Sequence, residues 1–358
     1  MITAELFVVG ALLGGFAFWV LGTFLAALAR GAKVRKQQRL SAELQPKIRD
    51  ALIDFLAGAD NRQAIREFIA QSREDAASAM LSFQTTVSGG ARDRLCELAL
   101  DEALVHDWCQ DARAHDTVRR RSAFLRLGFV SSYEPCRRVA GDLLLHGLGD
   151  SDPEVRLEAC RALVQAGERE EVESVFEAAI SNNLLIRILL TEDLRRHAVL
   201  LCERAVPEAL ASTDAPRVLA ALDILVAWER ALPLTGIFHM LHRDDPRVRI
   251  QALRLAPLVG LTPEDQASVL DALADPDVRI ATAAAQTAGR LRLEVALTGL
   301  ARCLRTGGPE LARIAAAALA EMPGAGWVTL GELAFSDNPV TATAAREALD
   351  RARQKGGA

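Results

Sequence analysis

One residue type recurs with a spacing that could serve the chemistry of binding. Arginine carries a planar guanidinium that stays charged and donates hydrogen bonds in a fork that matches carboxylate and phosphate groups. A row of such residues could hold an acidic partner. The interpretation that we favour is that each arginine pairs with an aspartate of a neighbouring stretch and fixes how those stretches stack. The row stands at one position of four similar stretches: Arg156, Arg187, Arg249 and Arg279.

Aspartate recurs at the turns of the same repeating pattern. Placed just before a helix, its carboxylate accepts hydrogen bonds from the unpaired N–H groups of the first turn. Proline follows within two residues, and it is tolerated there because the first helical N–H would have no partner. We interpret these aspartates as turn and helix-cap residues: Asp152, Asp214, Asp245 and Asp275.

Patterns for catalysis or metal binding are absent from the sequence. It holds no GxxxxGK[ST] phosphate loop, no HExxH pair and no GxSxG nucleophile turn. His239 and His242 lie three residues apart, but two imidazoles without further ligands nearby make a weak metal site. The six scattered cysteines form no CxxC pair and are typical of reduced thiols that pack as apolar side chains. We therefore assign no catalytic residue, cofactor or metal, and expect a protein that is not an enzyme.

Composition points to a helical fold. Half of the 358 residues are apolar while only 5% are aromatic, because Ala and Leu carry the apolar fraction. Both residues favour helices. The formal net charge of −5 argues against a dedicated nucleic-acid binder, which needs a basic excess.

The elements that would position the arginines repeat along the chain. Similar helical stretches begin at intervals of about 31 residues, a period typical of solenoids. In each, apolar residues fall on one helix face, and a second amphipathic helix precedes it, as over 233–241 and 263–273. One such hairpin cannot bury its apolar face alone, so the hairpins are expected to stack. Leu184 stands in for one missing proline among the markers Pro153, Pro216, Pro246, Pro276, Pro309 and Pro339.

The repeated motif resembles a known family. D-P-x-V-R-x-x-A at Asp152–Ala159 and Asp245–Ala252, with D-P-x-V-R at Asp275–Arg279, is similar to the HEAT repeat, especially its short PBS-lyase type. The resemblance covers about residues 115–354, although the units at 309 and 339 lack the Val-Arg pair. It implies an α-solenoid of the armadillo type, in which the Val-Arg helices line the concave side.

The N-terminus has the character of a membrane anchor. Residues 6–29 carry no charge, and at about 1.5 Å per residue they form roughly 36 Å of helix, enough to cross a bilayer's hydrocarbon core. Basic residues follow at once, which predicts that the N-terminus lies outside and the rest of the chain lies in the cytoplasm. A signal peptide needs basic residues before a shorter apolar stretch, and none is present, although the Ala-Leu-Ala at 27–29 leaves cleavage open as an alternative. Gly10 and Gly14 have a spacing that could support pairing of two spans.

The sequence thus predicts an all-α protein, an α-solenoid of HEAT-like helical hairpins preceded by one transmembrane helix. Its expected segments are an anchor at 1–30, a basic juxtamembrane segment at 31–40, an irregular helical cap at 41–115, the solenoid at 116–354 and a tail at 355–358. This organisation favours a scaffold at the inner membrane of a bacterium that binds a membrane-associated protein, such as an enzyme complex. Two alternatives stay open: a bilin lyase-like enzyme accessory, implied by the resemblance, and a nucleic-acid-binding repeat, which the net charge disfavours.

Overall fold

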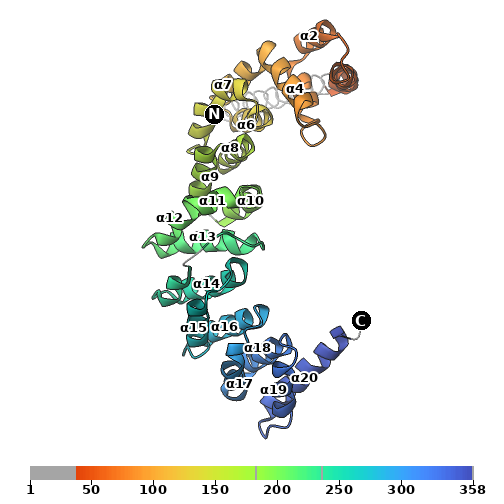
Figure 1. The fold of residues 1–358 in the computed structure, drawn as a ribbon. Coiled ribbons are helices and arrows are strands. Elements are labelled where there is room, and N and C mark those ends of the chain that lie inside the picture. The colour runs from red at the N-terminus through yellow and green to blue at the C-terminus, as the bar shows by residue number, and fades with distance from the viewer. Residues whose placement is uncertain (1–37, 182–183, 235–236, 357–358) are drawn as a thin grey trace, which may run out of the picture. The chain divides into compact units, whose positions relative to one another are not determined.

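The structure is a computed structural model that describes residues 38–181, 184–234 and 237–356. Every regular element within these ranges is a helix, which confirms the all-α prediction for this part of the chain. The helices form two compact units, which we describe separately, and the first ends at His146 (Figure 1).

The predicted membrane span falls outside the described residues. So do Gly10, Gly14 and residues 31–37 of the basic segment. Within the ranges that the structure covers, no helix combines the length and the apolar character that crossing a bilayer requires. The anchor therefore remains a prediction from sequence.

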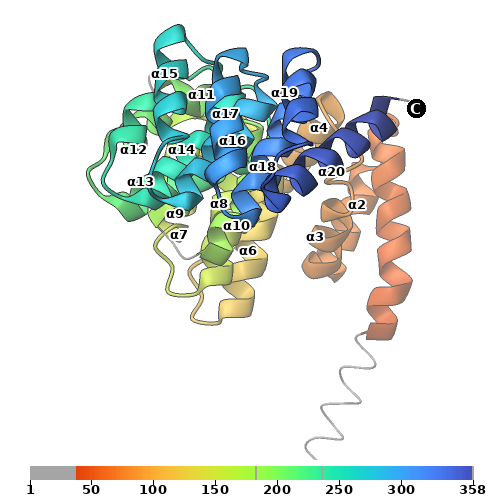
Figure 2. The same ribbon diagram turned by 90° about the horizontal axis from the view of Figure 1, so that it is seen from below.

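The first unit is a set of short helices with an apolar interior. The described part of its first helix covers 38–56 and lies beside α2 and α3 (Figure 2), where the Gln45 amide donates to the Ser78 hydroxyl. The boundary expected at 115/116 falls inside this unit, between two helices that pack together, α5 and α6. After the first helix the unit contains α2 (Arg62–Gln71), α3 (Arg73–Leu81), α4 (Gly90–Asp101), α5 (Leu104–Asp111), α6 (Thr117–Val130) and most of α7 (Glu134–Gly147).

The second unit begins at Gly147 and holds the repeats. Its elements are α8 (Pro153–Ala166), α9 (Arg169–Ser181), α10 (Leu184–Arg195), α11 (Ala198–Glu203), α12 (Ala205–Ala211), α13 (Ala215–Ala227), the 3-10 helix η1 (Ile237–His242), α14 (Pro246–Val259), α15 (Pro263–Ala272), α16 (Val278–Arg290), the 3-10 helix η2 (Glu294–Ala296), α17 (Leu297–Thr306), α18 (Pro309–Ala320), α19 (Ala325–Leu333) and α20 (Pro339–Gly356). The last helix includes residues 355 and 356, which were expected to belong to a tail.

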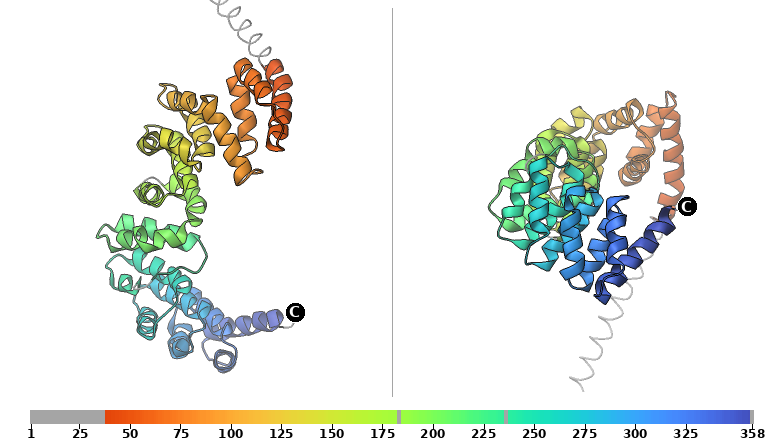
Figure 3. Two further views of the ribbon diagram at one scale, coloured as in Figure 1. Left: turned by 45° about the horizontal axis from the view of Figure 1, so that its top comes forward. Right: turned by 60° about the horizontal axis from the view of Figure 1, so that its bottom comes forward.

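The repeat helices of this unit form one continuous layer. Each repeat helix packs on the repeat helix that follows it, in the order α8, α10, α13, α14, α16, α18 and α20 (Figures 1 and 3). The helices between them in the chain complete the hairpins. Small side chains make this stacking close, and Ala252, Ala284 and Ala315 are fully or almost fully buried. The second unit is therefore a stack of helical hairpins, as the repeat period predicts.

Turn aspartates begin several of these helices, as their chemistry predicts. The N–H groups of Glu154 and Val155 donate to the Asp152 carboxylate at 2.8 and 3.3 Å, and the N–H of Arg247 donates to Asp245 at 2.8 Å. Asp214 occupies the cap position of α13 without a side-chain hydrogen bond. The fourth predicted cap residue, Asp275, does not cap α16.

Asp277 takes that role instead. Its carboxylate accepts from the N–H of Arg279 at 2.9 Å, while Asp275 accepts from the N–H of Asp277 at 2.8 Å. Both aspartates satisfy turn amides, and the one nearer the helix becomes the cap. As a result α16 begins at Val278, two residues after the proline that was expected to start it.

The helix expected over 233–241 is not seen in the described residues of that range, 233–234 and 237–241. Only a 3-10 helix is present there, at Ile237–His242. The Leu232 N–H donates to the Leu258 carbonyl at 2.8 Å, which ties the preceding segment to the end of α14. Pro233 also disfavours helical geometry in the residue before it and brings no N–H of its own. The described residues in the first half of this repeat therefore lack the expected α-helix.

Candidate binding groove

Two of the four repeat arginines join neighbouring repeats. The Arg249 Nη1 lies 2.7 Å from the Asp275 carboxylate at the next turn, and the Arg187 Nη1 lies 3.1 Å from the Asp223 carboxylate on α13. Both guanidiniums are largely buried in the stack. Such pairs fix the register of adjacent hairpins, so neither arginine is available to a partner.

The other two contact their own turns. The Arg156 Nη1 donates to the carbonyl oxygens of Asp150 and Ser151 at 2.6 and 3.2 Å. Arg279 is exposed and pairs with Asp277 at 2.7 Å, and this hydrogen-bonded partner lowers the pKa of Asp277 to about 2. The structure thus gives the four arginines three kinds of contact and does not assemble them into one strip.

Many other arginines in the first repeats of this unit also serve stacking. Each reaches an acidic side chain about one repeat away along the chain, where the pair links two hairpins. The pairs are Arg161 with Asp193, Arg169 with Glu203, Arg204 with Glu173 and Arg217 with Glu177.

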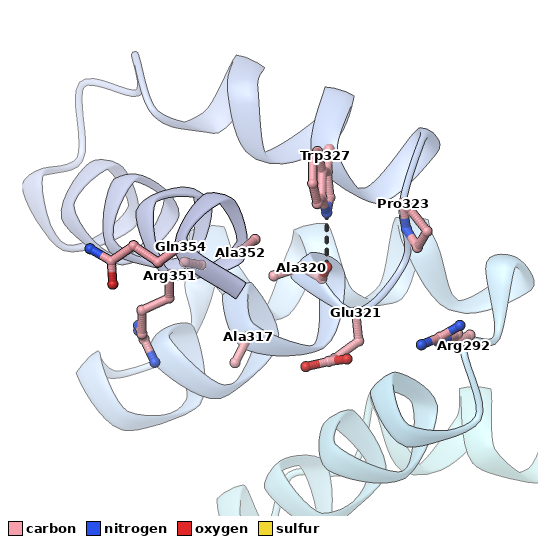
Figure 4. A pocket seen from close by; sticks show the side chains of 10 residues that line it. Arg292, Ala317, Ala320, Glu321, Pro323, Trp327, Arg351, Ala352 and Gln354 are labelled. Atoms are coloured by element: carbon pink, nitrogen blue, oxygen red, sulfur yellow. Dashed lines mark hydrogen bonds between the residues drawn. The ribbon is translucent and has the colours of Figure 1, made fainter. Parts of the chain in front are cut away.

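The last repeats differ, because two hollows open on their layer of repeat helices. One has a volume of about 360 Å³ and the other about 510 Å³, and they share Ala317 and Glu321 of α18 and the turn after it. Figure 4 shows the larger hollow, with Arg292 and Glu321 near one end and Arg351 and Gln354 near the other. Together the two hollows form what we call the arginine groove, which runs over α14, α16, α18 and α20.

Small residues make the floor of the arginine groove. Ala317 and Ala320 line it from α18, and Ala348 and Ala352 line it from α20. Gly289 of α16 also lines it and lets the backbones of α16 and α18 come close together. Side chains this short leave space between neighbouring helices that longer ones would fill.

Five arginines and a single glutamate stand around this floor: Arg254, Arg290, Arg292, Arg313, Arg351 and Glu321. Arg351 pairs with Glu347 at 3.8 Å. The other four arginines are exposed and form no ion pair among the described residues. The groove is therefore locally basic although the chain as a whole is acidic.

Arg292 holds a backbone conformation that favours glycine. Its φ is +50°, in the left-handed region. The Leu293 N–H donates to the Ala288 carbonyl at 3.0 Å, which is the turn that usually ends a helix with glycine. Gly167 fills the matching place after α8, with a φ of +78°. A side chain here strains the backbone by about 1 kcal/mol, and such strain is concentrated at functional sites.

Sequence reasoning missed this groove. Its arginines occupy different positions within their repeats, so they share no period along the chain. The visible signal was the alanine-rich composition of α16 and α18, where ATAAAQTAGR and ARIAAAALA leave little side-chain volume.

Other candidates in the described residues offer less chemistry. No group of three or more His, Cys, Asp or Glu side chains there could hold a metal ion. All six cysteines are free and buried. Burial raises the pKa of the Cys136 and Cys160 thiols to about 12, so the reactive thiolate is scarce at neutral pH.

A comparison with known families identifies one repeat in the chain. A family described as HEAT repeat matches residues 142–168. No curated protein matches the sequence significantly. Among solved structures the chain is similar to YibA of Escherichia coli, with 14% identity over 82% of this chain and 98% of that one and a TM-score of 0.34. The chain is also similar to human deoxyhypusine hydroxylase, with 17% identity over 88% of this chain and 98% of that one and a TM-score of 0.31.

A further similar structure is that of Kap95p, with 12% identity, 84% coverage of this chain, 47% of that chain and a TM-score of 0.47. Likeness this distant carries no information on activity or partner. The matched residues 142–168 span the end of α7 and α8, the first repeat helix of the continuous layer. Residues 142–168 therefore match the HEAT repeat family, and the second unit that they open is a stack of helical hairpins.

Proposed function

We propose that this protein is a membrane-anchored scaffold that binds a protein partner on the surface of its repeats. The observation that carries the proposal is the arginine groove, which presents four arginines without ion pairs among the described residues, on a layer where several other arginines pair across the stack. A solenoid offers an extended binding surface rather than an enclosed cleft. The chemistry of the groove suits recognition and includes no nucleophile or proton-transfer pair, so we assign the protein no enzymatic step.

The anchor is part of the same proposal. The apolar span at 6–29 and the basic residues after it support an N-terminus outside the inner membrane and repeats in the cytoplasm. Tethering confines the repeats to the neighbourhood of a membrane-associated partner. Such confinement raises the effective concentration and strengthens binding without a new contact.

Native-membrane crosslinking and purification test this function. The full-length chain, tagged at its C-terminus, is compared with a tagged unrelated protein that carries the same residues 1–40. We expect the repeats to enrich a specific membrane-associated protein, and the tag to be protected from protease in intact spheroplasts. Equal recovery of every neighbour by both proteins would contradict the scaffold. A tag that protease removes from intact spheroplasts would contradict the orientation.

A further inference from the structure

We infer that the arginine groove holds an extended acidic segment of the partner protein. This inference rests on the proposed scaffold function and names the chemistry of what is bound. Four charge-bearing side chains without ion pairs come from three successive repeats: Arg254, Arg290, Arg292 and Arg313. Guanidiniums at such sites bind carboxylates with two parallel hydrogen bonds.

The contrast with the rest of the second unit makes this cluster specific. Where an arginine serves stacking, its acidic partner lies on a neighbouring repeat, as in the pair between Arg187 and Asp223. Arg290 and Arg313 have no acidic partner of that kind among the described residues, and both are exposed. The carboxylates that would complete these sites must then come from another molecule.

The dimensions fit a short stretch of extended chain. Packed helices lie about 8–10 Å apart, so the layer from α14 to α20 spans roughly 27 Å over three helix spacings. An extended peptide advances about 3.3 Å per residue, and about eight residues would cross that distance. The two hollows share Ala317 and Glu321, so one continuous chain could occupy both.

Two further side chains define where the segment is not acidic. Glu321 lies at the junction of the two hollows, so the arginines of one hollow are separated from those of the other by a side chain that is not basic. Trp327 is 38% exposed at the larger hollow, and its indole N–H already donates to the Ala320 carbonyl at 2.8 Å. The remaining contact that Trp327 can offer is its ring. The segment should therefore carry acidic residues on both sides of a neutral centre that includes an apolar or aromatic residue.

A protein segment suits this groove better than a phosphate polymer or a lipid surface. Nucleic acids carry a charge at every nucleotide and gain affinity from each neutralised phosphate. The chain carries a formal net charge of −5, which opposes a polymer of uniform negative charge. A flat bilayer would not insert into hollows between helices. Oligonucleotides and anionic vesicles nevertheless belong in the test as competing ligands.

Fluorescence anisotropy on the detergent-solubilised full-length protein tests the inference. The probe is a fluorescein-labelled peptide of about ten residues, with Asp and Glu on both sides of a central Ser-Phe. Its controls are the same peptide with Asn and Gln, an oligothymidylate of similar charge, and phosphatidylglycerol vesicles. We expect binding of the acidic peptide alone, weakening as salt screens the charges.

A matched pair of charge reversals places the binding site. Arg290→Glu with Arg313→Glu alters the groove, while Arg302→Glu with Arg305→Glu makes the same charge change on α17. We expect the groove variant to bind the acidic peptide at least about tenfold more weakly, since hydrogen bonds to charged groups are among the strongest. The α17 variant should bind within about twofold of the wild type. If the groove variant does not fold, Arg290→Gln with Arg313→Gln replaces it.

Each contrary outcome has a definite meaning. The inference is overturned if both charge reversals weaken binding equally, if the Asn and Gln peptide binds as well as the acidic one, or if only the oligonucleotide or the vesicles bind. If membrane crosslinking enriches a partner that the groove variant still binds as the wild type does, the scaffold stands and the groove assignment fails. If the wild-type chain enriches no partner, the scaffold itself fails.

Discussion

Gly289 of α16 lies so close to Ala318 of α18 that a Cβ atom on Gly289 would stand 2.7 Å from the Ala318 Cα. No side chain fits at this distance without movement of one backbone. The contact brings two repeat helices together beside the floor of the arginine groove. The absence of a Cβ atom at Gly289 therefore affects both the stability of the second unit and the shape of the groove.

Substituting this glycine should destabilise the second unit. Gly289→Ala forces α16 and α18 apart, and we expect the free energy of unfolding to fall by about 1–3 kcal/mol, as for other overpacked sites. Urea unfolding, monitored by circular dichroism, measures this change. Gly331→Ala on α19 is the control, because a Cβ there would meet nothing within 4 Å. That change should be neutral or stabilising by up to about 1 kcal/mol. Equal effects of the two substitutions would contradict the close contact.

Relieving the strain at Arg292 should separate stability from binding. Arg292→Gly removes the side chain from a φ of +50°, and we expect the free energy of unfolding to rise by about 0.5–1 kcal/mol. The same change removes a guanidinium from the groove and should weaken binding of the acidic peptide. Thermal unfolding and anisotropy measure the two effects.

Glu229 provides the control for this substitution, since it also has a positive φ, of +47°, and does not line the groove. Glu229→Gly should stabilise the protein by a similar amount and leave peptide binding unchanged. A loss of stability in Arg292→Gly would show that the arginine holds the fold together. It would then be a structural residue instead of a strained binding residue.

The starts of several repeat helices could be predicted from the sequence, because proline and cap residues act locally. Proline and the preceding cap residue act over a few bonds, so the starts of α8, α14, α18 and α20 at Pro153, Pro246, Pro309 and Pro339 could be predicted from spacing. The start of α16 could not, because two aspartates stand at this turn and each accepts from a different amide, so spacing alone does not show that Asp277 is the cap.

Long-range packing decides the rest. Arg290 ends α16, whereas Arg313 lies in the first half of α18, so they occupy different positions of the repeat and give no periodic signal. They line the same hollow only because α16 and α18 pack closely. Conversely, Arg249 and Arg279 share a position in the sequence motif yet differ in environment. A sequence pattern shows that residues recur, whereas the surrounding contacts decide what each one does.

That difference in environment predicts unequal effects of removing the two arginines. Arg249 bridges to Asp275 within the stack, with side-chain exposures of 24% and 13%, and Arg249→Ala leaves a mostly buried carboxylate without its partner. We expect the free energy of unfolding to fall by about 1–3 kcal/mol. Arg279 is 67% exposed and pairs within its own turn, so Arg279→Ala should change the free energy of unfolding by less than about 0.5 kcal/mol. Urea unfolding at neutral pH measures both. Equal losses would show that the inter-repeat pair does not fix the stacking.

The carboxyl of Asp277 should make stability depend on pH in the acid range. Hydrogen bonds from Arg279 hold its pKa at about 2 in the folded protein, below the ordinary value of 3.8. A pKa lowered by folding contributes stability that is present above the ordinary value and is lost as the pH falls through the folded one. Asp277→Asn keeps a cap residue at the start of α16 but removes the charge. The variant should be less stable than the wild type at pH 7, and the difference should disappear between about pH 4 and pH 2.

Chemical unfolding at a series of pH values measures this difference, with Asp214→Asn as the control. Asp214 holds a cap position without a side-chain cap hydrogen bond, so its replacement should leave the pH profile of stability unchanged. High salt should reduce the effect at Asp277, because both partners lie at the surface where mobile ions screen the charges. A difference between Asp277→Asn and the wild type that persisted below pH 2 would mean that the carboxylate acts through its shape at the turn, and that its charge contributes nothing.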